Sequence, residues 1–281
     1  MSFSSKIKEE LSRLNTFSSI ELVQAEFYGY LISNNTIFEN GVVRFSTENE
    51  HNINRLKRIL KRLNIEFDME LQGKIYSIVF ECKKLITYQE INTEKDEIKK
   101  AIVRGAYLGG GSLNNPNSKY HLEIIFKTEE DRTKIAEIIK SFNIEIKYFK
   151  RNEKYSLYIK DGEEISKFLA LIGANNSVLR YEEIRVEKDS RNSINRIVNC
   201  ETANLNKTIN ASVYQIKAIQ KIKKFGKFNE LTDTLKEIAD VRIENPNLSL
   251  TELGKLLKNP IGKSGVNHRL KKIIQLSEEI N

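Results

Sequence analysis

The pattern of apolar and polar positions repeats once along the first 180 residues. Apolar residues recur at helical spacing and then at every second position, so each copy predicts a helix, a strand, a helix, two strands and a short helix. The predicted strands lie at residues 42–47, 65–71 and 75–80 in the first copy and at 122–128, 144–149 and 155–159 in the second. This order predicts a pseudo-two-fold α+β domain over about residues 18–180, with an amphipathic helix over residues 4–14 packed onto it.

A stripe of small residues marks the first helix of each copy. The stripes consist of Ala25, Gly29 and Ser33 in the first copy and Ala101, Gly105 and Gly109 in the second. Residues four apart share one helix face, and glycine inside a helix costs about 1 kcal/mol relative to alanine. Two matching stripes therefore predict that the two helices pack against each other at close range.

Three predicted helix starts carry capping signals. Thr47, Thr128 and Ser249 each stand three residues before an acidic residue. A hydroxyl in that position accepts a hydrogen bond from the backbone N–H three residues later. We therefore expect all three residues to be N-caps.

The chain from residue 231 onward predicts three helices. The first ends at the Asn-Pro-Asn sequence of residues 245–247, because proline disfavours helix in the residue before it. A short helix follows Ser249, and a longer one begins near residue 263 after a break at 259–262. We expect the short helix to bury Leu250, Leu253, Leu256 and Leu257. This is the order of elements of a helix-turn-helix domain.

The last helix carries polar and basic residues opposite an apolar face formed by Val266, Leu270, Ile273 and Ile274. Recognition helices enter the major groove with their N-terminal residues, where Arg and Asn read base edges and Lys neutralises phosphates. The expected DNA-binding residues are Lys263, Ser264, Asn267, His268, Arg269, Lys271 and Lys272. The alternative interpretation is a C-terminal amphipathic helix with a solvated basic face.

A polar helix edge precedes this domain. It is formed by Arg191, Asn192, Asn195, Arg196 and Asn199, and of these we expect Arg191, Asn195 and Arg196 to bind DNA. The pattern alone leaves open whether this edge binds phosphates or caps neighbouring backbone. A basic helix follows and ends near Gly226. The predicted boundaries are therefore residues 1–185 for the duplicated domain, 186–228 for a basic linker helix region and 229–281 for the helix-turn-helix.

The charge of the chain is concentrated near its C-terminus. The formal net charge is +8, and residues 189–281 contribute +6 of it, with 16 basic and 10 acidic residues. Hydrophobic residues make up 40% and charged residues 30%, which is typical of a soluble protein. A polyanionic partner fits this distribution.

The sequence contains few cysteine and histidine residues that could bind a metal or act in catalysis. The two cysteines, Cys82 and Cys200, form no CxxC pair, and the histidines are His51, His121 and His268. These spacings provide no zinc finger, disulfide framework or Ser/His/Asp triad. We expect no cofactor and no bound metal.

Membrane segments are also not expected. No apolar run reaches the roughly 18 residues that a spanning helix needs, and the N-terminus lacks the apolar core of a secretory signal. The expected location is the cytoplasm.

The glycine-striped helices resemble the paired helices of the LAGLIDADG homing endonucleases. Residues 27–35 and 103–111 match the nine-residue motif of that family, in which an acidic residue near each helix end binds catalytic metal. The acidic position falls on Asn34 and Gly110. An amide and a glycine cannot supply the anionic oxygens that two-metal hydrolysis needs, so we expect no catalytic residues and no nuclease activity.

In those nucleases, the sheet face away from the helices holds the duplex and should be positive. Alternation along residues 65–71 turns the apolar positions to the core and leaves Glu66, Asp68 and Glu70 on the outer face, which would repel DNA. The second copy is of mixed charge, with a basic turn at residues 150–154. We favour a protein partner for this domain over direct DNA binding.

Four strings of residues resemble the WhiA family. They are residues 104–108 (Arg-Gly-Ala-Tyr-Leu), 120–124 (Tyr-His-Leu-Glu-Ile), 195–205 (Asn-Arg-x-x-Asn-Cys-Glu-Thr-Ala-Asn-Leu) and 263–270 (Lys-Ser-Gly-Val-Asn-His-Arg-Leu). The resemblance covers essentially the whole chain. It implies a bacterial DNA-binding regulator with a degenerate homing-endonuclease domain and a helix-turn-helix, linked to cell division, chromosome segregation and, in some bacteria, sporulation.

The hypothesis from sequence is therefore a cytoplasmic, nucleoid-associated transcription regulator that binds double-stranded DNA through its C-terminal helices and is not an enzyme. Two alternatives stay open. One is a protein-binding adaptor with non-specific DNA affinity, and the other is a residual metal-dependent DNA endonuclease.

Overall fold

The computed structural model of the chain describes residues 2–81 and 88–280, so Cys82 lies outside the described residues. The chain divides into two compact units, Met1–Asp189 and Ser190–Asn281. Helix α7 (Asn175–Lys224) is 50 residues long and belongs to both, because it continues through the boundary at Asp189. The domain limits at residues 185 and 228 stay predictions.

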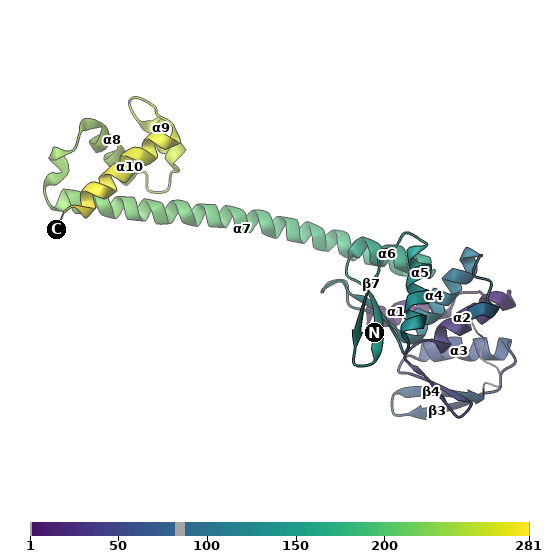
Figure 1. Cartoon of the computed structure of the whole chain (residues 1–281). Coiled ribbons are helices and arrows are strands. Elements are labelled where there is room, and N and C mark those ends of the chain that lie inside the picture. The colour runs from purple at the N-terminus through teal and green to yellow at the C-terminus, as the bar shows by residue number, and fades with distance from the viewer. Residues whose placement is uncertain (1, 82–87, 281) are drawn as a thin grey trace. The chain divides into compact units, whose positions relative to one another are not determined.

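Unit 1 holds two copies of one arrangement, as the sequence repeat predicts (Figure 1). Helix α1 (Phe3–Ser12) comes first. The first copy holds α2 (Ile20–Leu31), β1 (Thr36–Glu39), β2 (Val42–Thr47), α3 (Glu50–Arg62), β3 (Asp68–Gln72), β4 (Ile75–Glu81) and the 3₁₀ turn η1 (Tyr88–Glu90). The second holds α4 (Asp96–Gly110), β5 (Gly111–Leu113), β6 (Leu122–Phe126), α5 (Glu129–Lys140), β7 (Lys147–Arg151), β8 (Lys154–Ile159) and α6 (Gly162–Leu171).

The two sheets have the same topology. Their strand orders are β1-β2-β4-β3 and β5-β6-β8-β7, and all neighbouring strands are antiparallel. The pseudo-two-fold α+β architecture is therefore confirmed. Strands β1 and β5, which follow the first helix of each copy, were not expected from the sequence because they are only four and three residues long.

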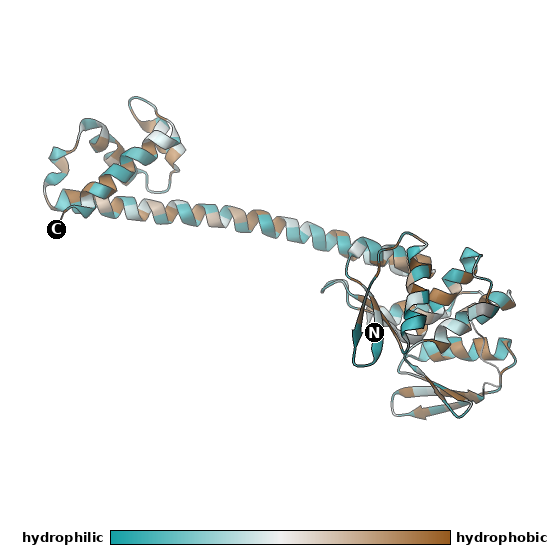
Figure 2. Ribbon diagram, viewed as in Figure 1, coloured by the Kyte–Doolittle hydropathy of each residue, from teal (hydrophilic) through white to brown (hydrophobic). Residues whose placement is uncertain are grey.

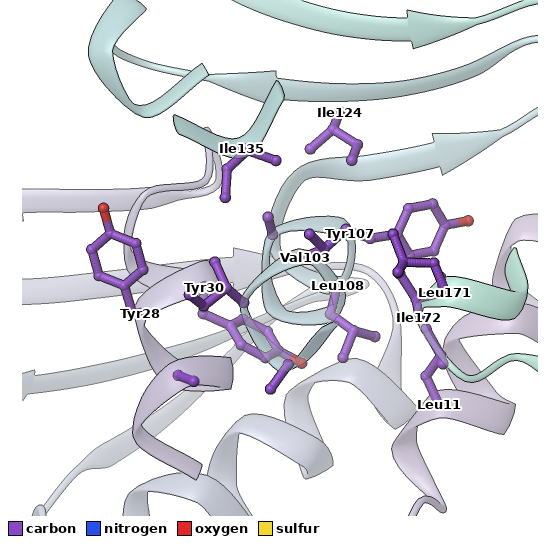
Figure 3. Close-up of a cluster of buried hydrophobic side chains, with 14 of the residues drawn as sticks. Leu11, Tyr28, Tyr30, Val103, Tyr107, Leu108, Ile124, Ile135, Leu171 and Ile172 are labelled. Carbon is purple, nitrogen blue, oxygen red and sulfur yellow. The ribbon is translucent and has the colours of Figure 1, made fainter. Parts of the chain in front are cut away.

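Helices α2 and α4 cross at their small residues. A Cβ atom on Gly29 would lie 2.3 Å from the carbonyl oxygen of Ile102, and one on Gly105 would lie 2.0 Å from that of Glu26. Only glycine permits this approach of the two backbones. Figure 3 shows Tyr30 of α2 in one apolar cluster with Val103 and Leu108 of α4. The close approach joins the two copies through one core.

The capping predictions had mixed outcomes. The hydroxyls of Thr128 and Ser249 accept hydrogen bonds from the N–H three residues on. The Glu252 carboxylate accepts the Ser249 N–H in return, which completes a capping box. The prediction for Thr47 is wrong. Helix α3 begins two residues later with Asn49 as its N-cap, because the Asn49 side chain accepts the Asn52 N–H while Thr47 accepts the N–H of Asn49 itself.

The predicted burial of the apolar residues of β3 is also wrong. Met69 and Leu71 do share the helix-facing side of the sheet with Ile78 and Tyr76, their register partners, but they are 43% and 61% exposed. Strand β3 is the edge of its sheet, and α3 packs on β2 and β4. Edge position therefore leaves part of the inner face of β3 in solvent.

A carboxylate is buried between the copies, which the sequence did not predict. Glu26 on α2 is 1% exposed and accepts hydrogen bonds from Arg55 Nε at 2.7 Å, Arg55 Nη2 at 2.8 Å and Arg104 Nε at 3.1 Å. Arg104 also donates to the carbonyl of Ile172, and Arg55 to that of Leu14. The network ties both copies to the segments that flank them.

Unit 2 is helical. After α7 it contains the 3₁₀ turn η2 (Lys227–Glu230), α8 (Asp233–Glu244), α9 (Leu250–Leu256) and α10 (Lys263–Glu278). Its core combines Ile219 and Ile222 of α7 with residues of all three following helices. Of the leucines expected to be buried on and after α9, Leu253 and Leu257 are buried and Leu250 is partly so, whereas Leu256 is 52% exposed and that prediction is wrong. In the part of the chain that the structure describes, no helix is long and apolar enough to cross a membrane.

Candidate nucleic-acid interface

Helices α9 and α10 form the helix-turn-helix predicted from the sequence. Leu257 ends α9 in an extended conformation, and Gly262 precedes the first residue of α10. The turn folds back on α9, because the Ile261 N–H donates to the carbonyl of Gly254 at 3.1 Å. A Cβ on Gly254 would lie 2.2 Å from the Ile261 carbonyl oxygen, so glycine is needed there.

Helix α10 separates its two faces as the pattern predicts. Val266, Leu270 and Ile273 are at most 1% exposed and pack in the core of unit 2, while Ile274 is half-buried. The polar residues proposed for DNA contact all remain accessible. Lys263, Ser264, His268, Lys271 and Lys272 are exposed, and Asn267 and Arg269 are half-exposed.

The positively charged side chains of α10 lie toward its N-terminal end, and its acidic residue lies at the C-terminal end. Lys263, Arg269, Lys271 and Lys272 occupy its first ten residues, and Glu278 ends it. No side chain of the described residues caps its N-terminus, so the first backbone N–H groups point toward solvent beside Lys263. The partial positive charge of a helix start adds to these cations, and the combination favours an anionic oxygen.

The polar edge on α7 is a separate surface. Arg191, Asn195 and Arg196 are exposed, and Arg196 Nε donates to the carbonyl of Asn192 in the same helix at 3.2 Å. The contact between α7 and the end of α10 lies at Tyr214, whose hydroxyl donates to Glu278. At 1.5 Å per residue, Arg191 lies about 35 Å along the helix from that contact. No hydrogen bond or ion pair within the described part of the chain joins Arg191, Asn195 or Arg196 to α10.

An arginine that the sequence analysis missed holds the bend before α9. Arg242 of α8 is 1% exposed, and its Nη1 donates to the carbonyl of Leu248 at 2.8 Å and lies 3.4 Å from that of Asn245. Burial lowers the pKa of Arg242. An arginine on the apolar side of the α8 pattern was the available signal. Its contacts fix the start of the helix-turn-helix.

The expected degenerate nuclease site lies where α2 and α4 end. The N–H of Asn34 donates to the carbonyl of Ile125 at 3.0 Å, and a Cβ on Gly110 would lie 2.7 Å from that same oxygen. Position 110 therefore has no room for a carboxylate without a shift of β6. The LAGLIDADG fold implies a divalent cation here, and the residues present do not fit one. Among the described residues, no three His, Cys, Asp or Glu side chains are grouped to hold a metal.

The fold and this surface define a class of protein in which a duplicated LAGLIDADG-like domain without the acidic pair is followed by a helix-turn-helix. The family comparisons agree with this description. Residues 99–191 match the WhiA LAGLIDADG-like domain, and residues 194–277 match the WhiA C-terminal HTH domain.

Relatives are similar over the full length of the chain. A protein named "Probable cell division protein WhiA" from Clostridium tetani is 38% identical, over 100% of this chain and 98% of the relative, and one from Staphylococcus haemolyticus is 35% identical over the same shares. The crystal structure of full-length DUF199/WhiA from Thermatoga maritima aligns with a TM-score of 0.63 at 30% identity, covering 100% of this chain and 99% of the other. The chain belongs to the WhiA family.

Proposed function

We propose that this protein is a cytoplasmic, nucleoid-associated transcription regulator that binds double-stranded DNA and acts in cell division and chromosome segregation, and in sporulation where the organism sporulates. The observation that carries the proposal is the accessible basic face of α10 at the start of the helix. The name of the relatives supports the link to cell division. We further propose that the protein is not an enzyme, since Asn34 and Gly110 supply no anionic oxygen for a metal.

Each proposed contact has a distinct role. Asn267, His268 and Arg269 would read base edges in the major groove, because side chains near the start of a recognition helix reach furthest into it. Lys263 and Ser264 at the helix start, and Lys271 and Lys272 further along, would hold phosphates on either side. Arg191, Asn195 and Arg196 would add phosphate contacts outside the reading helix.

The first-copy sheet of unit 1 is proposed to contact protein. Its outer face carries Asp68 and Glu70, and Arg44 donates to Glu70 at 2.7 Å. This contact lowers the pKa of the Glu70 carboxyl, which keeps it ionised. An acidic face repels phosphates and suits a basic protein surface.

The test is binding of the intact chain to chromosomal duplex fragments, followed by fluorescence anisotropy at increasing salt. We expect the binding constant to fall steeply, with a log–log slope of about −0.9 for every phosphate contact. Equal affinity for every fragment, including random duplexes, would favour the adaptor with non-specific DNA affinity. Cleavage of supercoiled plasmid with magnesium that Asn34→Ala abolishes would instead support a nuclease.

A further inference from the structure

The outer faces of the two sheets in unit 1 have opposite charge at equivalent positions. The strand registers align the first copy with the second at an offset of 79 residues, which places Asp68 opposite Val79 and Lys147 opposite Tyr158. The charged pairs at equivalent positions are Asp68 and Lys147, Glu81 and Lys160, and Arg44 and Glu123. The net charge of these positions is therefore −1 in the first copy and +1 in the second.

Further side chains strengthen the contrast. Arg151 and Lys154 are register partners at the edge of the second sheet and share its outer face, and both are exposed. Their equivalents in the first sheet are Gln72 and Ile75, which carry no charge. A duplex laid across both sheets would gain phosphate contacts on one half and meet carboxylates on the other. The basic half is the part suited to a polyanion.

The same basic face carries a row of three aromatic rings. The ring centroids of Phe149 and Tyr158 lie 5.5 Å apart, and those of Tyr158 and His121 lie 6.1 Å apart. The rings come from β7, from β8 and from the residue before β6, so the row runs diagonally over three neighbouring strands. At the positions equivalent to Phe149 and Tyr158, the first copy has Glu70 and Val79.

These rings lie on the side of the sheet away from its core. The alternate residues Leu122, Ile124, Leu157 and Ile159 are at most 2% exposed and form the inner face. Phe149 is 37% exposed, and Figure 2 shows the β7–β8 end of unit 1 as largely hydrophilic. Cross-strand aromatic pairs can stabilise a sheet, but that alone does not account for cations around the row. Lys160 Nζ lies 5.1 Å from the Tyr158 ring centroid, and Tyr158 lies in register between Lys147 of β7 and Glu123 of β6. The cations Lys147, Lys160, Arg151 and Lys154 outnumber this one carboxylate.

Aromatic rings flanked by cations match the chemistry of single-stranded nucleic acid. Unpaired bases expose flat faces that stack on aromatic side chains, while Lys and Arg hold the backbone phosphates. A duplex hides those faces inside its own stack. We propose that the outer face of the second-copy sheet, formed by His121, Phe149, Tyr158, Lys147, Arg151 and Lys154, binds single-stranded DNA. The choice of DNA rests on the proposed function, which brings the chain to chromosomal DNA.

A tryptophan reporter tests this surface in the full chain, which has no natural tryptophan. Phe149→Trp places one indole in the aromatic row, and Glu70→Trp places one at the equivalent position of the acidic sheet. Adding an oligo(dT) about 15 nucleotides long, the span of one single-strand binding site, should cause a saturable loss of tryptophan fluorescence in Phe149→Trp and little change in Glu70→Trp. Equal responses of the two variants, or none in Phe149→Trp, would overturn the proposal.

A second measurement separates this surface from the helix-turn-helix. The double variant Phe149→Ala, Tyr158→Ala should weaken oligo(dT) binding about tenfold or more. The matched double variant of the first sheet, Glu70→Ala, Val79→Ala, should bind oligo(dT) as the wild type does. The aromatic pair should leave duplex affinity unchanged, while Lys271→Gln with Lys272→Gln should weaken the duplex and spare oligo(dT). If the lysine variant left duplex affinity unchanged while the aromatic variant still lost oligo(dT) binding, the proposed function would be contradicted and the single-strand site would not.

Two further results would overturn the proposal. Oligo(U) that binds much more tightly than oligo(dT) at the same rings would reject DNA as the ligand. An aromatic pair variant that loses duplex affinity as strongly as oligo(dT) affinity would assign the face to duplex DNA instead. Circular dichroism of each variant checks that the sheet is intact, so that lost binding reports the rings themselves.

Discussion

Replacing Glu26 by Gln should lower the free energy of unfolding of unit 1 by about 3–5 kcal/mol. The carboxylate is buried with two guanidinium groups, Arg55 and Arg104, at 2.7–3.1 Å. Removing its charge leaves the arginines as buried cations without their counter-ion, and the cost of an unpaired buried charge is large. Urea unfolding of the intact protein followed by circular dichroism measures the change.

The matched control is Glu21→Gln on the same helix. Glu21 pairs with Lys95 at 2.8 Å, but both side chains are more than half exposed. Exposed ion pairs contribute little to stability, so this variant should unfold almost as the wild type does. Similar small changes in both variants would show that the buried network does not hold the two copies together.

Replacing Lys271 and Lys272 by Gln should weaken duplex binding roughly fifty-fold at 0.1 M salt. Both lysines are exposed on α10, beside the buried Leu270 and Ile273 that anchor the helix. If each lysine neutralises one phosphate, the log–log salt slope should become less steep by about 1.8. Anisotropy titrations at several salt concentrations measure both quantities.

The control for this variant is Lys236→Gln on α8, which removes a cation of the same unit outside the recognition helix. It should leave the salt slope nearly unchanged. If Lys236→Gln weakened binding as much per lysine removed as the double variant does, net charge rather than the α10 surface would account for the affinity.

Periodicity predicted most of the fold because most helices and strands bury one side against a core. The outer strands of the repeats show its limit. Alternation placed Met69 and Leu71 on the correct side of β3, but the position of β3 at a sheet edge, which leaves them exposed, depends on strand order. Strands β1 and β5 are too short for a pattern to form.

Long-range polar contacts could not be predicted at all. Glu26 meets Arg55 and Arg104, which lie 29 and 78 residues away in the chain. A charged residue within an apolar helix was visible in the sequence, but its partners depend on how α2, α3 and α4 pack. Arg242 is similar, because its partners are backbone carbonyls without a side-chain signal.

The candidate interface was partly accessible to sequence reasoning. The apolar positions of α10 identified its buried side, and the structure agrees at Val266, Leu270 and Ile273. Which accessible residues touch DNA stays a prediction, because exposure alone does not assign a contact. The aromatic row of the second sheet was missed, since Phe149 and Tyr158 lie on different strands, His121 precedes a third, and the rings meet only through register.

The most direct test of base reading by α10 is a chromosome-wide map of where the intact protein binds, compared with a His268→Ala, Arg269→Ala double variant at equal abundance. These two side chains are proposed to touch base edges, and Lys271 and Lys272 keep the non-specific affinity. We expect the wild type to occupy discrete sites and the variant to lose them while staying on DNA. Unchanged sites in the double variant would contradict sequence recognition by this helix.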